Sequence, residues 1–228
     1  MILALEGLLA GAAHVLSGPD HLVGVAPLAV ERTRSVRPWV LGLNWGIGHG
    51  VGVALLGVLG QTLLSSADVE VASFWAERLV GIVLIVLGLN AIRRARGLVL
   101  HEHLHTHDGD THGHLHVHEH LDDSHSAGKE KTHGHRHAAL GIGLVHGLAG
   151  AGHFWVVLPS LAMSPSQAAV FIASYIGASV LAMAIFGGAI GKLAHSVGSK
   201  GLRRLFTSIG AITVAVGVAW LVLTWQST

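Results

Sequence analysis

Long stretches without a charged residue constrain this chain more than any other feature of its sequence. Residues 38–67 contain no Asp, Glu, Lys or Arg, and the same is true of residues 137–191 and 205–228. An α-helix needs about 20 consecutive apolar residues to cross the hydrocarbon core of a bilayer. Only 12% of the residues are charged, compared with roughly 25% in soluble domains. These properties exclude an ordinary soluble globular domain.

The uncharged stretches predict an all-α integral membrane protein with six transmembrane helices. Residues 137–191 have room for two spans, with a turn where Ser164 and Pro165 interrupt the apolar run. The first span is not a cleavable signal peptide, because it lacks a basic leader and carries His14, Asp20 and His21 in its middle. The expected spans are residues 5–29, 38–61, 73–93, 138–161, 167–190 and 205–225.

The basic residues predict how these spans are oriented. Apart from Arg78, every Lys and Arg falls between spans 1 and 2, 3 and 4, or 5 and 6. Cytoplasmic loops carry an excess of basic residues, so these three connections should be cytoplasmic. Both termini should then lie outside, and the protein should be a multi-pass component of the plasma membrane.

Three classes of function are disfavoured by what the sequence lacks. The formal net charge of +1 gives no indication of a nucleic-acid partner, and no nucleotide-binding loop is present. The chain has no cysteine, which removes disulfides, thiolate metal sites and thiol-redox transport.

An internal repeat divides the chain into two halves of three spans. A shift of 132 positions superimposes Leu8 on Leu140, Gly11 on Gly143, His14 on His146, His21 on His153 and Pro27 on Pro159. Because three is an odd number, the second half must cross the membrane in the opposite orientation. The prediction is two inverted three-helix repeats, residues 1–96 and 138–228, joined by a cytoplasmic linker over residues 97–137, with a substrate site where the halves meet.

Ionisable side chains inside the predicted spans mark the candidate site. Ionisable groups at membrane depth are costly and commonly line an ion or proton path. Imidazole suits nickel, cobalt, copper and zinc, whereas calcium and magnesium prefer oxygen ligands. The alternative, that each histidine is an ordinary interior polar group, is weakened because four of the five are related by the repeat. The candidate metal ligands are His14, Asp20, His21, His49, His146 and His153.

The spacing of His14 and His21 leaves two structural alternatives. In a regular helix they would lie about 10.5 Å apart along the axis, too far for one ion with ligands roughly 2 Å away. Either two sites lie in series, or the helix is broken between them. Pro19 disfavours a continuous helix, and residues 147–152 in the second half contain three glycines. Breaks are therefore expected in helices 1 and 4.

The linker between the halves is rich in histidine. Residues 101–137 contain 13 of the 19 histidines and are polar, so we expect a mobile segment without regular structure. The linker could buffer or deliver metal, it could sense metal and gate transport, or it could be dispensable. A zinc-protease site at His101-Glu-His-Leu-His105 is disfavoured, because histidine runs produce this spacing by chance. The candidate auxiliary ligands are His101, His103, His105, His107, His112, His114, His116, His118 and His120.

The motifs His14-Val-Leu-Ser-Gly-Pro-Asp-His21, Trp45-Gly-Ile-Gly-His-Gly50 and His146-Gly-Leu-Ala-Gly-Ala-Gly-His153 resemble the nickel/cobalt permease superfamily. The likeness is particularly to its short, urease-accessory-type nickel permeases. The eight-span members have one residue fewer between the first histidine and Asp-His. The resemblance implies that His14, Asp20 and His21 bind metal and that His49 contributes. Asn44 and Tyr175 would be supporting polar groups.

The function expected from the sequence is transport, not catalysis. Nickel or cobalt would be the transported substrate, no catalytic cofactor is expected, and a cytoplasmic nickel chaperone is a candidate partner. Uptake is favoured over proton-coupled efflux of nickel, cobalt or zinc. A membrane-anchored metal sensor or store is the alternative from a different class.

Overall fold

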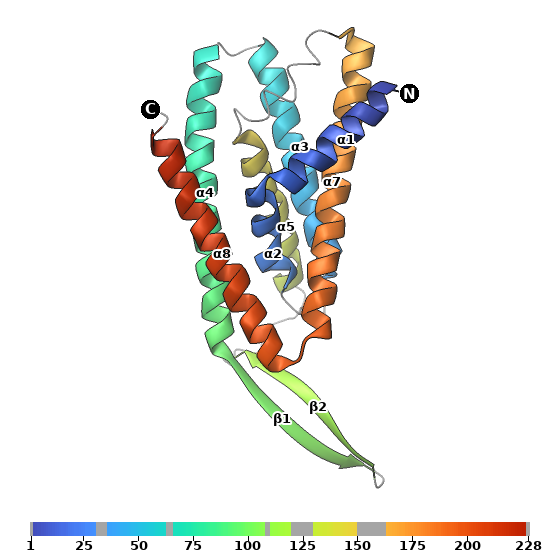
Figure 1. Cartoon of the computed structure of the whole chain (residues 1–228), viewed down its shortest axis with the longest axis vertical. Coiled ribbons are helices and arrows are strands. Elements are labelled where there is room, and N and C mark those ends of the chain that lie inside the picture. Colours follow the sequence, from blue (N-terminus) through green and yellow to red (C-terminus); the bar gives the residue numbers. More distant parts are fainter. Residues whose placement is uncertain are drawn as a thin grey trace.

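The computed structural model describes residues 2–30, 36–62, 66–107, 110–119, 130–149 and 163–226. Over these residues it is a helical bundle with one β-hairpin at an end; α1 begins and α8 ends at the opposite end of the bundle (Figure 1). The helices are α1 (Ile2–Ser17), α2 (Pro19–Ala29), α3 (Pro38–Thr62), α4 (Ser66–Gly97), α5 (Glu130–Leu148), α7 (Pro165–Ser196) and α8 (Ser199–Gln226). The strands are β1 (Leu98–His107) and β2 (Asp110–Glu119).

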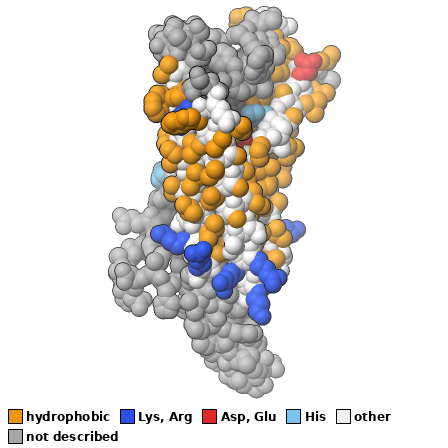
Figure 2. Space-filling view, turned by 60° about the vertical axis from the view of Figure 1, so that its left-hand side comes forward, with side chains coloured by type: hydrophobic (Ala, Val, Ile, Leu, Met, Phe, Trp, Pro, Cys, Tyr) orange, Lys and Arg blue, Asp and Glu red, His pale blue; other side chains and the backbone are white. Residues whose placement is uncertain are grey.

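The helices have the length and composition of membrane spans. In the described part of the chain, α7, α8 and the Phe74–Arg96 portion of α4 are each able to cross a bilayer, and α1 with α2 forms a fourth, bent candidate. These four coincide with expected spans. Helix α3 covers the expected span 38–61, whereas α5 covers only the start of 138–161, because residues 150–162 lie outside the described part. Hydrophobic side chains cover the middle of the bundle on the face shown in Figure 2, as a lipid-facing surface requires.

The first span is broken, as its sequence predicts. Helices α1 and α2 meet at an angle of 71°, and Gly18 between them has extended backbone angles, φ −87° and ψ 101°. Pro19 occupies the first turn of α2, where its missing N–H costs nothing and its fixed φ suits the start of a helix. The expected second break lies outside the described residues, since α5 ends at Leu148.

Helices pack in pairs that cross between the two expected halves. Helix α1 lies along α7, α5 lies along α3, α4 lies along α8, and α3 also lies along α7. Glycines permit the first two approaches: a Cβ at Gly11 would collide with the backbone of Tyr175, and one at Gly147 with the backbone of His49. Close backbone contact at small residues is typical of helices in membranes. Candidate site residues are thus held where helices of different halves touch.

Arg78, the one basic residue outside the expected cytoplasmic connections, is buried and has a structural role. Its guanidinium donates to the carbonyl oxygens of Phe74 at 3.0 Å and Thr224 at 2.8 Å. The last carbonyls of a helix have no partner within that helix, so Arg78 satisfies one near the end of α8. It therefore joins α4 to α8.

The expectation of a structureless linker is wrong for the residues described. Strands β1 and β2 pair antiparallel, with His103 opposite His114 and His105 opposite His112. Apolar or β-branched residues alternate with histidine over much of this segment, and an Asp-Gly pair, Asp108-Gly109, separates the strands. That dipeptide is strongly favoured in two-residue hairpin loops. The prediction of a segment without regular structure rested on its polar composition and gave too little weight to this hairpin signal.

Candidate metal site

The break after Ser17 brings together two histidines that a straight helix would separate. The imidazole centroids of His14 and His21 lie 4.4 Å apart, with the rings nearly perpendicular. Of the two alternatives left by the sequence, the broken helix is therefore the one found. The backbone closes tightly here, because the N–H of Gly18 donates to the His14 carbonyl at 3.0 Å and the N–H of His21 donates to the Gly18 carbonyl at 3.2 Å.

Asp20 is a buried carboxylate between two imidazoles. Its Oδ1 lies 3.0 Å from Nδ1 of His21, and its Oδ2 lies 3.2 Å from Nε2 of His146. Asp20 also stands in the first turn of α2, where the positive end of the helix dipole favours a negative charge. One carboxylate thus orients a histidine from each of the two expected halves.

His49 completes the cluster from α3. Its ring centroid lies 5.0 Å from that of His21, 5.5 Å from that of His146 and 5.7 Å from that of His14. Asp20, His21, His49 and His146 are buried, and His14 is half-buried. The four histidines and the aspartate come from four helices, α1, α2, α3 and α5.

Two sets of three potential ligands overlap in this cluster. His14, His21 and His49 form one set, and Asp20, His21 and His146 form the other; within each, the ligand atoms lie within 4.8 Å of one another. Ligand nitrogens about 2.0–2.1 Å from a zinc-like ion are at most about 4.2 Å apart, so a small closure of either set would fit one. His21 belongs to both.

The remaining predicted site residues fall in different places. Tyr175 from α7 is buried beside His14, with ring centroids 5.6 Å apart. Asn44 donates its side-chain amide to the Val40 carbonyl at 2.7 Å, so this donor is used within α3. His153 and His120 lie outside the described residues, and the other eight candidate auxiliary ligands belong to β1 and β2, where only the backbone is described.

Two residues that sequence analysis left without a role help to build the cluster. Trp45 is fully buried and packs beside His146, with ring centroids 6.0 Å apart. Its position one helical turn before His49 places both on the same face of α3, a signal that the sequence offered. Gly18 has a steric role that only the structure reveals, because a Cβ there would collide with the His21 ring and lie 2.9 Å from Oδ1 of Asp20.

Gly18→Ala should therefore weaken metal binding while leaving the helices formed. For nickel, the metal expected from the sequence, displacing the His21 ring and the Asp20 carboxylate should lower the affinity of the purified protein about ten- to a hundredfold, the usual range for groups that position ligands. Calorimetric titration would measure it. Gly177→Ala is the matched control, since a Cβ at Gly177 meets no atom within 4 Å; equal affinities for the two variants would contradict the steric role of Gly18.

Fold and site together define a multi-pass helical membrane protein with a buried His/Asp cluster that has the composition of a metal site. Residues 47–219 match the cytochrome c biogenesis protein transmembrane region family. The chain belongs to that family. No solved structure matches it.

The curated relatives add two further likenesses. The chain is 31% identical over 224 residues to Chloroplast protein FOR GROWTH AND FERTILITY 2 of Arabidopsis thaliana, with 96% of this chain and 56% of the relative covered. It is also 31% identical over 222 residues to Chloroplast protein FOR GROWTH AND FERTILITY 1 of that plant, covering 94% and 58%. The chain therefore spans little more than half of these relatives.

A third relative agrees in part with the resemblance noted in the sequence. The Urease accessory protein UreH of Bacillus sp. (strain TB-90) is 30% identical over 89 residues, which are 38% of this chain and 37% of that protein. The urease-accessory likeness is thus distant and partial.

Proposed function

We propose that this protein transports a divalent transition-metal ion, nickel or cobalt, through the His/Asp cluster. The observation that carries the proposal is the sharing of His21 between two sets of potential ligands. A protein that only stored a metal would need one closed set of ligands. Two adjacent, overlapping sets provide neighbouring positions for an ion that must bind and then leave.

The chemistry of the cluster favours nickel and cobalt over harder cations. Four imidazoles and one carboxylate offer more nitrogen than oxygen ligands. Magnesium and calcium prefer oxygen ligands, whereas imidazole suits nickel, cobalt and zinc. The partial similarity to a urease accessory protein supports nickel as the first metal to test. With no cysteine in the sequence, a dithiol is not available to this chain, so its function is assigned to the His/Asp cluster.

The inverted repeat remains part of the proposal and has structural support. If spans 1 and 4, 2 and 5, and 3 and 6 are equivalent, the pair α1–α7 corresponds to α5–α3, and the pairs α4–α8 and α3–α7 each correspond to themselves. These four pairs pack extensively. Inverted repeats in transporters commonly bind substrate at a broken helix, and Asp20 and His21 stand directly after the break, in the first turn of α2.

The proposed direction is uptake into the cytoplasm. Lys and Arg side chains on the face shown in Figure 2 gather mainly toward the hairpin end of the bundle, which supports a cytoplasmic placement of that end. An inside-negative potential favours inward movement of a divalent cation by about 4.6 kcal/mol per 100 mV, twice the value for a single charge. Uptake then needs no coupled ion. Efflux of nickel, cobalt or zinc would work against the potential and would need coupling to the movement of another ion, such as the proton.

The histidine-rich hairpin is proposed as an auxiliary element. On the cytoplasmic side it would buffer metal or deliver it to a nickel chaperone. Sensing metal to gate transport is the second role to be tested.

Radioactive nickel flux into proteoliposomes with an imposed inside-negative potential tests this function. Wild type and a variant lacking residues 98–129 should both take up nickel, and empty liposomes should not. Flux that requires an opposing proton gradient would favour efflux. If folded wild type gives no flux, and tight nickel binding disappears only with the hairpin, the protein is a sensor or store.

A further inference from the structure

An open groove lies at the start of α8, a helix that contributes no residue to the His/Asp cluster. It has a volume of about 380 Å³ and is lined by Lys200, Arg203, Arg204, Thr207 and Ser208. These positions repeat at intervals of three and four, so they share one face of the helix. All five side chains are exposed.

The lining has the composition of an anion site. It presents one ammonium, two guanidinium groups and two hydroxyls, with no carboxylate among the lining residues. Guanidinium groups bind phosphate oxygens through two parallel hydrogen bonds. The N-terminal end of a helix adds a partial positive charge, and α8 begins at Ser199. A phosphate group matches this surface in charge and in hydrogen bonding.

The place of the groove along α8 indicates which phosphate it holds. Beyond Ser208 the large exposed side chains of α8 are apolar, beginning with Ile212 and continuing through Val218 and Val222 to Leu223. The exposed surface thus changes from basic, through hydroxyl, to apolar within three helical turns. A phospholipid has the same order of groups, from headgroup phosphate through ester region to acyl chain.

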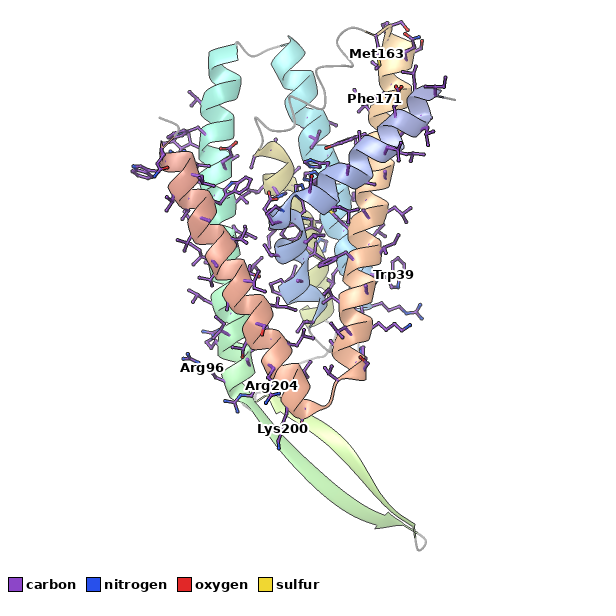
Figure 3. The ribbon with its side chains drawn as sticks, viewed as in Figure 1. Trp39, Arg96, Met163, Phe171, Lys200 and Arg204 are labelled. Atoms are coloured by element: carbon purple, nitrogen blue, oxygen red, sulfur yellow. The ribbon has the colours of Figure 1, made fainter. Side chains whose placement is uncertain are left out.

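The neighbouring helix strengthens the positive field at this end. Arg96, near the end of α4, lies at the same end of the bundle as Lys200 and Arg204 (Figure 3). The two helices are joined there, because Ala91 and Ala95 of α4 pack with Leu202 and Phe206 of α8 in one apolar cluster. Basic sites between membrane helices on the cytoplasmic side are suited to anionic headgroups.

We propose that the groove formed by Lys200, Arg203, Arg204, Thr207 and Ser208 binds the phosphate headgroup of an anionic phospholipid. Its acyl chains follow the apolar face of α8. The bound lipid braces the α4–α8 pair at the hairpin end and is independent of metal transport.

Thermal unfolding of the purified full-length protein in neutral detergent tests the site. The probes are short-chain phosphatidylglycerol, short-chain phosphatidylcholine and inorganic phosphate. Phosphatidylglycerol should raise the midpoint of wild type in a saturable way, and phosphatidylcholine should do so only at much higher concentration. In the double variant Arg203→Gln/Arg204→Gln, half-saturation should need roughly ten to thirty times more phosphatidylglycerol, since each basic side chain contributes about one kilocalorie per mole.

The control is a second pair of exposed cations of equal charge, Arg37→Gln/Lys192→Gln. These residues lie on the α3–α7 side, where Pro38 packs against Gly191, and their replacement should leave the titration unchanged. Equal losses in both double variants would show general charge attraction and overturn the site. An equal effect of inorganic phosphate would show a free-anion site instead. If the arginine variant is not recovered folded, Lys200→Gln gives the same comparison with a smaller expected loss.

Discussion

His21→Ala should abolish nickel flux and lower nickel affinity at least about a hundredfold. The reason is geometric: His21 belongs to both sets of three potential ligands, so its loss leaves two ligands in each. Loss of a group that merely positions a ligand already costs ten- to a hundredfold. His14→Ala and His146→Ala each remove a ligand from one set only and should have smaller effects. Calorimetric titration and proteoliposome flux would measure the series.

His195→Ala is the matched control for this series. His195 is an exposed histidine near the end of α7, so its replacement should leave affinity and flux at the wild-type level. Circular dichroism and size-exclusion chromatography would show that each variant is folded. Wild-type affinity in folded His21→Ala would overturn the assignment of the cluster as the transport site.

Asp20→Asn should lower nickel affinity about a hundredfold while the protein still folds. The amide has nearly the same shape as the carboxylate and can still hydrogen-bond to the imidazoles of His21 and His146. It removes the one negative charge in the cluster. A hundredfold loss of affinity corresponds to about 2.7 kcal/mol of binding free energy. The electrostatic attraction between two opposite unit charges 4 Å apart is ~4 kcal/mol at an effective dielectric constant of about 20, so the loss of one charge is large enough to account for it.

Glu6→Gln makes the same chemical change on the same broken span. Glu6 is exposed on α1, so this variant should bind nickel as wild type does. If Asp20→Asn and Glu6→Gln have equal affinities, the Asp20 carboxylate does not contact the ion. If Asp20→Asn alone is unfolded, the carboxylate is required for folding, and the His21→Ala series then tests the cluster.

Much of the membrane part could be predicted because bilayer physics leaves few choices. Uncharged stretches of about 20 residues form helices in a bilayer since no other partner exists there for the backbone. Pro19 at membrane depth predicted the break, and the structure has it at Gly18. The sequence left two alternatives, two sites in series or a broken helix that brings His14 close to His21. The observed break corresponds to the second alternative.

Other features depend on side-chain positions that residue types and spacing do not specify. The sequence shows that Gly18 lies near His21, but not that the missing Cβ makes room for the His21 ring. Asn44 was expected to be a supporting polar group, yet its side chain bonds within its own helix. The hairpin was predictable from Asp108-Gly109 and the alternating pattern, but the polar composition suggested a segment without structure.

The crossed pairing of helices determines which parts of the molecule can move as rigid bodies. Tyr175 is locked to Gly11, and His49 to Gly147, by backbone contacts too close for a Cβ. The backbones of α3 and α7 are equally close, since a Cβ at Gly42 would collide with the Met183 carbonyl. Helices α1, α7, α3 and α5 are therefore linked in one rigid unit, which is built from both sequence halves and carries His14, His49 and His146. Asp20 and His21 stand on α2, beyond the break at Gly18, so a motion of α2 against this unit would change both ligand sets together.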